Sequence, residues 1–208
     1  ALIAPVAGFA LGQADADLDD AVSLIASLGF AVVVPVVALV FGGAAIGDLR
    51  EDKTLVYFWL RPMDRWPVVV GAALAAITLV APITLVPVVL ASILTGAGGD
   101  LVGATAIAGV VAVISYSALF TLFGVWLKRF IVCGLAYILI WEGFIAQAGP
   151  GVARFALRKY TRSILVSRTG ADLDLADFPL AVGIVVPLVV AVLALMVAAW
   201  RLGAQEVE

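Results

Sequence analysis

Residues 47–55 read Gly47-Asp48-Leu49-Arg50-Glu51-Asp52-Lys53-Thr54-Leu55, and residues 60–65 read Leu60-Arg61-Pro62-Met63-Asp64-Arg65. This stretch, called the charged break below, separates two long apolar runs. It holds eight of the charged residues of a chain that has 12 lysines and arginines and 15 aspartates and glutamates. Charge is costly in hydrocarbon, so a membrane protein places such a density where it meets water or a soluble partner. The charged break therefore predicts an aqueous segment between two membrane spans.

The composition of the whole chain argues against a soluble globule. Of its 208 residues, 64% are hydrophobic and 13% are charged, and the mean hydropathy is +1.20. Soluble domains carry about 25% charged residues, and a domain this small cannot bury so much apolar surface. The apolar runs are continuous and roughly twice as long as the alternating strands of membrane barrels, which have about 10 residues. The expected fold class is an all-α integral membrane protein.

Hydropathy places the expected spans in one transmembrane domain over residues 1–208. The runs long enough to span are residues 22–46, 67–94, 101–127, 130–147 and 178–200. Residues 1–11 are apolar but too short, and they lack the basic start of a signal peptide. We expect them to end a first span that is largely missing from this chain, which gives six spans. Gly42-Gly43, Gly47 and Gly71-Ala72-Ala73 are expected to allow close helix packing.

Basic residues predict which side of the membrane each loop faces, because cytoplasmic loops are rich in Lys and Arg. The charged break is placed inside by Arg50, Lys53, Arg61 and Arg65. Counting spans then puts residues 128–129 and the C-terminus inside as well. The same count puts residues 150–168 outside, although they carry Arg154, Arg158, Lys159, Arg162 and Arg168.

Two explanations of this conflict stay open. Residues 130–147 could be a re-entrant hairpin that leaves the following segment inside. Alternatively, residues 150–168 could be an amphipathic outer segment whose basic side chains snorkel to the lipid headgroups. We favour the second explanation, for the reason given with the family resemblance below.

The charged break also predicts a helix at the inner membrane surface. Asp48 is a favourable N-cap, and Glu51 follows it three residues later, as in a capping box. Pro62 disfavours continuation, so the expected helix covers about residues 49–60. On the residues alone, the segment is either a solvated loop with interfacial anchors or a helix on which a soluble subunit docks.

Polar residues inside the apolar runs are candidates for function. Glu142 is the one carboxylate in the five long runs, and a central charge costs about 2.5–3.5 kcal/mol on insertion scales. It is either paired with, or capping, the loop that carries Arg154 and Arg158, or it is a gating, path or proton-coupled residue. A further polar patch either forms interhelical hydrogen bonds or lines a path: Ser115, Tyr116, Ser117 and Thr121.

The sequence carries no motif of an enzyme or an ATPase. It has no G-x-x-x-x-G-K-[ST] loop, so we do not expect the chain to bind ATP through a P-loop. It has no histidine and one cysteine, Cys133, which excludes a His-activated nucleophile and a paired Cys site. The net charge of −3 does not suggest a nucleic-acid partner. We expect no catalytic residue, bound cofactor or metal.

The charged break resembles the permeases of type-2 ABC exporters. In that family an acidic–basic cluster, a Gly-Thr-Leu and an Arg-Pro turn precede the third span. Here residues 48–51 stand for the cluster, Thr54-Leu55 follows, and Arg61-Pro62 forms the turn, while Lys53 replaces the usual Gly and Asp64 a frequent Ser. The later motifs are also similar to that family: Trp141-Glu142-Gly143-Phe144, Gly149-Pro150-Gly151 and Tyr160-Thr161-Arg162-Ser163.

The resemblance covers residues 22–200 and implies a six-span permease subunit of an ATP-driven exporter in the cytoplasmic membrane. A second permease half, of the same or a related chain, would complete the path through the lipid bilayer. Residues 150–168 would form short extracellular helices, which is why the outer placement is favoured. Two ABC ATPase subunits would carry ATP and Mg and would dock on the coupling helix at about residues 49–60.

The resemblance also assigns expected roles to residues. The docking residues would be Asp48, Arg50, Glu51, Lys53 and Thr54. The interface anchors would be Tyr57, Phe58, Trp59, Arg61 and Arg65. From the residues alone, and not from the resemblance, the possible gating or path residues are Glu142, Tyr116 and Ser115. The alternative interpretation is an ATP-independent secondary carrier gated through Glu142, or a membrane scaffold that transports nothing.

Overall fold

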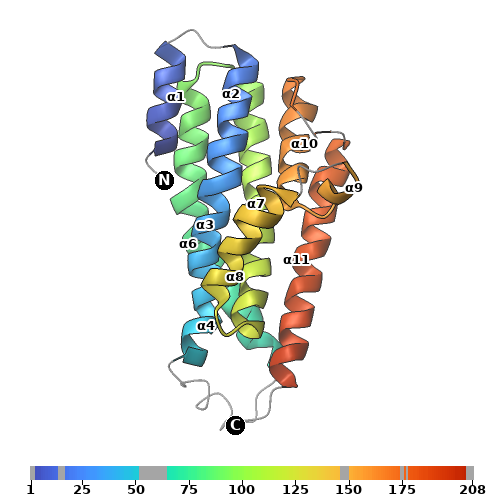
Figure 1. Ribbon diagram of the computed structural model, residues 1–208. Coiled ribbons are helices and arrows are strands. Elements are labelled where there is room, and N and C mark those ends of the chain that lie inside the picture. The colour runs from blue at the N-terminus through green and yellow to red at the C-terminus, as the bar shows by residue number, and fades with distance from the viewer. Residues whose placement is uncertain are drawn as a thin grey trace.

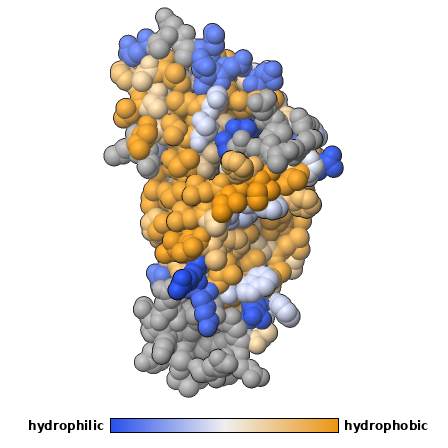
Figure 2. Space-filling model, in the orientation of Figure 1, coloured by the Kyte–Doolittle hydropathy of each residue, from blue (hydrophilic) through white to orange (hydrophobic). Residues whose placement is uncertain are grey.

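The computed structural model describes residues 3–13, 17–51, 65–145, 150–173, 176 and 178–204, and in this part of the chain it contains helices and no strand. Figure 1 shows these helices as an elongated bundle. Four of the described helices are long and apolar enough to cross a membrane: Leu18–Leu49, Trp66–Leu94, Gly99–Trp126 and Leu180–Gly203. The predicted fold class, an all-α membrane protein, is confirmed. Figure 2 shows the matching surface, an apolar middle zone between two more hydrophilic ends.

The elements follow one another in this order: α1 (Ile3–Gln13), α2 (Leu18–Leu24), η1 (Ile25–Val33), α3 (Val34–Ala38), η2 (Leu39–Gly43), α4 (Ala44–Glu51), α6 (Trp66–Leu94), α7 (Gly99–Trp126), α8 (Phe130–Ala136), η3 (Tyr137–Glu142), α9 (Pro150–Ala153), α10 (Leu157–Thr169) and α11 (Leu180–Gly203). The η segments are π-helical. Of the four long spans, the one that contains α7 is the most buried, and α6, α10, α11 and η2 all pack against it.

The first long span differs from its expected form. Segments α2 to α4 run on without a break from Leu18 to Glu51, whereas the expected span covered residues 22–46. Asp48 therefore lies inside α4 and does not cap the start of a new helix, so that prediction is wrong. The physical reason is that the carbonyls of the preceding turn already accept the N–H groups at Asp48, which leaves a side-chain cap no orphan donor to satisfy.

Small residues let α1 approach α6 closely. A Cβ added at Gly8 would lie 2.5 Å from the carbonyl oxygen of Ala91, and one at Gly12 would collide with the carbonyl oxygen of Leu94. Glycines four residues apart form such a face on membrane helices. Gly71 does not do this, because nothing lies within 4 Å of the Cβ it lacks. The expectation of close packing over Gly71-Ala72-Ala73 is therefore wrong at Gly71, whereas Ala73 is 1% exposed.

The expected span 130–147 is much shorter in the structure. Segments α8 and η3 end at Glu142, which makes a helix of about 20 Å, whereas the hydrocarbon core is about 30 Å thick. This helix, called the half-helix below, crosses the face of the bundle in Figure 1. It begins next to α4 and ends beside the start of α10, so it connects two elements that lie at opposite ends of the bundle.

The segment after the half-helix lies at the end of the molecule opposite to α4, which holds the first residues of the charged break. The backbone N–H of Asp172 donates to Oδ1 of Asp19, with 3.2 Å between the two atoms. Asp19 lies near the start of the long helix, and Asp48 lies near its other end, about 40 Å away. In Figure 1, α10 and α2 lie at the same end of the bundle, while α4 and the end of α11 lie at the other end. Helix α10 and the described end of the charged break thus lie at opposite ends of the bundle, and the outer placement of residues 150–168 stays a prediction.

Helix α10 is more deeply packed than the snorkelling interpretation predicts. It contacts α7, α11 and η1. Lys159 is only 4% exposed, and its Nζ lies 4.7 Å from the centroid of the Phe178 ring. An ammonium over an aromatic face is attracted by the ring quadrupole. Arg154 and Arg168 are exposed, so the snorkelling expectation suits these two residues but not Lys159.

Candidate functional site

Glu142 lies at the end of η3 and is 2% exposed. Its Oε2 accepts a hydrogen bond from the hydroxyl of Tyr116 in α7. Its Oε1 accepts one from the hydroxyl of Tyr137 at 2.9 Å and one from the backbone N–H of Leu157 at 3.1 Å. We call these four residues the Glu142 cluster. One carboxylate thus joins the half-helix, the central span and the first residue of α10.

The π-helical form of η3 makes this geometry. Glu142 follows Tyr137 by five positions. In an α-helix these two side chains would lie about 140° apart around the helix axis. In a π-helix the hydrogen bonds join residues five apart, as the N–H of Gly143 and the carbonyl of Ile138 do at 3.0 Å. Residues five apart then share a face. The Tyr137 hydroxyl can therefore reach the carboxylate of its own helix.

The cluster satisfies a carboxylate that would otherwise be costly to bury. A buried charge needs hydrogen-bonded partners, and here three donors supply them. Leu157 is the first residue of α10, where backbone N–H groups lack acceptors inside the helix and the helix dipole favours an anion. Glu142 therefore caps α10. Among the described contacts, neither Arg154 nor Arg158 donates a hydrogen bond to it, so the cap is made to the backbone, while the positive charge of Arg158 attracts the carboxylate.

Aromatic packing holds the two hydroxyls in place. The ring of Tyr137 meets Phe120 and Phe123 edge-on, at centroid distances of 6.2 and 5.9 Å. The ring of Tyr116 stacks on Phe120 at 6.0 Å. Edge-to-face and offset-stacked rings are the favoured aromatic geometries. The hydroxyls are thus fixed by the packing of α7 against the half-helix.

The rest of the predicted polar patch does not join this cluster. Ser115 is 1% exposed, and its hydroxyl has no hydrogen-bond partner in the described part of the chain. The hydroxyl of Ser117 is likewise unpartnered there, and Thr121 bonds within its own helix, to the carbonyl of Ser117 at 2.7 Å. Of the four patch residues, Tyr116 is the one whose side chain bonds to another element.

The half-helix is also held at its other end. Phe130, its first residue, is 2% exposed. Its ring covers Gly43 and Gly47, one turn apart on the long helix, and a Cβ at either glycine would collide with the ring. On the same long helix, Leu39 fills the space that a Cβ at Gly134 would need. We call the contact of Phe130 with the two glycines the Phe130 seat.

Two of the five predicted docking residues and four of the five predicted interface anchors fall outside the described residues. Asp48 is exposed on α4, and Arg50 and Glu51 belong to the same helix. The following residues lie outside the described part: Lys53, Thr54, Tyr57, Phe58, Trp59 and Arg61. Arg65 immediately precedes α6, and its Cγ lies 4.0 Å from an added Cβ at Gly203 of α11. The coupling helix over residues 49–60 stays a prediction.

Sequence reasoning missed Tyr137, Leu157 and Phe130. A π-helical turn leaves no signature in composition, so Tyr137 could not be paired with Glu142. The contact with Leu157 is made through its backbone, so its side chain carries no signal. The spacing of Gly43 and Gly47 did indicate a close contact, but it did not identify Phe130 as the residue that makes it.

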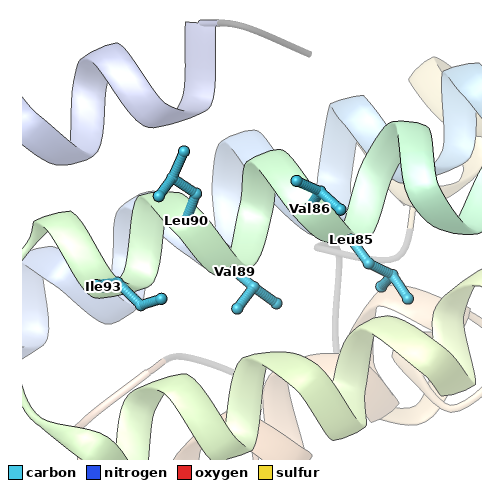
Figure 3. A pocket seen from close by; sticks show the side chains of 5 residues that line it. All are labelled: Leu85, Val86, Val89, Leu90 and Ile93. Atoms are coloured by element: carbon cyan, nitrogen blue, oxygen red, sulfur yellow. The ribbon is translucent and has the colours of Figure 1, made fainter.

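A separate apolar groove of about 380 Å³ lies along α6 (Figure 3). Its lining residues are Leu85, Val86, Val89, Leu90 and Ile93. With no polar side chain it suits hydrocarbon and can neither orient a polar ligand nor perform chemistry. Among the described residues, no group of His, Cys, Asp and Glu could hold a metal ion.

Comparison with known proteins assigns the family. The family model described as "ABC-2 family transporter protein" matches residues 3–133. Neither the curated proteins nor the solved structures gave a match. The matched region contains the charged break and the Phe130 seat, and it stops before Glu142. This chain therefore belongs to the ABC-2 transporter family, as a multi-pass membrane permease subunit whose partner is an ABC ATPase.

Proposed function

We propose that this chain is the permease subunit of an ATP-driven exporter, with its charged break and C-terminus in the cytoplasm. Two ATPase subunits, which bind ATP and Mg, dock on the charged break. A second permease half, of the same or a related chain, completes the path. Closure of the ATPases moves the docked segment, and the spans alternate between access from the inside and access from the outside.

The observation that carries the proposal is the position of the charged break at the end of a long, continuous helix. A displacement applied at Asp48 acts on a helix that runs unbroken from Leu18 to Glu51. The ends of α7 and α11 on that side carry further basic residues: Lys128, Arg129 and Arg201. This pattern supports a cytoplasmic position. The basic residues of α10 run against it, but α10 is packed into the bundle and is not a free loop.

Purification of the full chain in mild detergent from its own cell tests the function. We expect a stoichiometric partner with a P-loop and ATPase activity to co-purify. Reproducible absence of such a partner, with the permease folded and monodisperse, would contradict the proposal.

Charge reversal tests the docking site. Arg50→Glu and Glu51→Lys are each expected to lower the co-purified ATPase by about tenfold, because like charges placed across an interface repel. Insertion of the permease should be unchanged. The matched control is Arg168→Glu, which reverses an exposed charge at the opposite end. Equal ATPase recovery from all three variants would remove the docking assignment.

The alternative of a secondary carrier gated through Glu142 has less support. A proton-coupled carboxylate must exchange with water or substrate, whereas the Glu142 oxygens already accept three hydrogen bonds in a buried place. No observation in the described residues favours a scaffold without transport.

A further inference from the structure

We propose that the half-helix, residues 130–142, is a mechanical link from the charged break to α10. In this arrangement Phe130 and Glu142 are positioning residues for transport. The inference rests on the proposed function, because it assigns a route for motion that the ATPase supplies. It goes further in naming the element that receives this motion and the element that is moved.

The inner end of the link is tied to the helix that carries the charged break. Gly47, which immediately precedes Asp48, lies under the Phe130 ring, and so does Gly43 one turn earlier. The ring leaves no room for even one added carbon at either glycine. Tight packing of this kind transmits a displacement because interiors are dense and deform little. A shift of α4 must therefore move Phe130.

The outer end of the link is tied to α10 by hydrogen bonds. The carboxylate of Glu142 holds the N–H of Leu157 at 3.1 Å, at the N-terminus of α10. Residues 143–145 turn away directly after it. Because the carboxylate also binds Tyr116 in the central span, it fixes the position of α10 relative to α7. A displacement of Glu142 must move α10 or break this cap.

The half-helix is exposed on one face between its two attachments. One face carries large apolar side chains that this chain leaves exposed: Ile131, Val132, Leu135, Leu139 and Ile140. Its other face holds Gly134 and Tyr137 against the bundle. A helix of about 20 Å that is fixed at its ends and open on one side can move as a rigid body. This arrangement is what a link requires.

Two reporter positions test the route in the complex with its ATPase. In a Cys133→Ala background, spin labels are placed at Val40→Cys on the long helix, which is 51% exposed, or at Ser167→Cys on α10, which is also exposed. The change in each signal on nucleotide trapping with ATP and vanadate is measured. We expect both labels to respond in the otherwise unaltered permease.

Breaking the outer attachment should separate the two responses. With Glu142→Leu, which removes the acceptor of the Leu157 N–H, we expect the Ser167 response to fall by at least half while the Val40 response persists. Glu142→Gln keeps the size of the side chain but removes one acceptor oxygen and the charge, so it should lower the Ser167 response less, and it remains informative if Glu142→Leu folds poorly. The control is Leu139→Ala, which alters a 67% exposed side chain on the same helix and should leave both responses intact.

The outcomes separate the two proposals. If no ATPase co-purifies, the proposed function fails before any label is read. If ATP is hydrolysed and the Ser167 label does not respond, or responds fully in both cluster variants, the link is overturned. Loss at Ser167 with a retained response at Val40 supports it.

Discussion

Glu142→Leu is expected to destabilise the permease by about 2–4 kcal/mol, because it removes the acceptor of three hydrogen bonds at once. The stranded donors are the hydroxyls of Tyr116 and Tyr137 and the backbone N–H of Leu157. Each buried donor left unpaired costs about 1–3 kcal/mol, and local relaxation recovers part of the total. The free energy of unfolding in mixed micelles, titrated with a denaturing detergent, measures the loss.

Milder variants should give a graded series. Tyr116→Phe and Tyr137→Phe each delete one donor and keep the ring, and single hydrogen bonds between membrane helices are worth about 0.6 kcal/mol on average. Glu142→Gln keeps the size of the side chain and one acceptor oxygen. Its loss of stability should therefore fall between that of the two Tyr→Phe variants and that of Glu142→Leu. Leu139→Ala serves as the control, because its side chain is 67% exposed. A Leu variant as stable as the parent would show that the cluster does not hold the fold.

Hydropathy predicted much of the fold because the bilayer imposes strong rules. In hydrocarbon every backbone polar group must be bonded within the chain, so long apolar runs become helices. The runs at residues 67–94, 101–127 and 178–200 correspond to α6, α7 and α11 within a few residues. Hydropathy did not predict the short length of the half-helix, because composition does not distinguish a short apolar helix from one that spans the membrane.

The site was predictable in part. The cost of a carboxylate in lipid singled out Glu142, and the same reasoning indicated a capping role for it. The partners depend on tertiary contacts that the sequence does not encode locally. Tyr137 needs a π-helical turn, and Leu157 contributes a backbone N–H that any residue could supply. Asp48 was misread as a cap because a local motif was weighed without the long helix that already satisfies the backbone around it.

The roles of the glycines also depend on tertiary contacts that the sequence does not show, and substitutions at glycines test the Phe130 seat. Gly43 and Gly71 look alike in sequence, since both lie in apolar helical runs. In the structure a Cβ at Gly43 or Gly47 would collide with the Phe130 ring, whereas nothing lies within 4 Å of a Cβ at Gly71. Identical substitutions at these positions should therefore have effects of opposite sign.

Gly43→Ala combined with Gly47→Ala is expected to destabilise the permease by about 1–4 kcal/mol. Overpacking a dense contact costs about 1–3 kcal/mol per site, which outweighs the gain of up to about 1 kcal/mol for replacing a helical Gly by Ala. Gly71→Ala receives the gain alone and should be neutral or more stable. Adding Phe130→Ala to the double variant removes the ring and should restore part of the loss, and this recovery ties the effect to the seat. If the double variant gains stability as Gly71→Ala does, Phe130 is not packed on these glycines, and the inner attachment of the half-helix is absent.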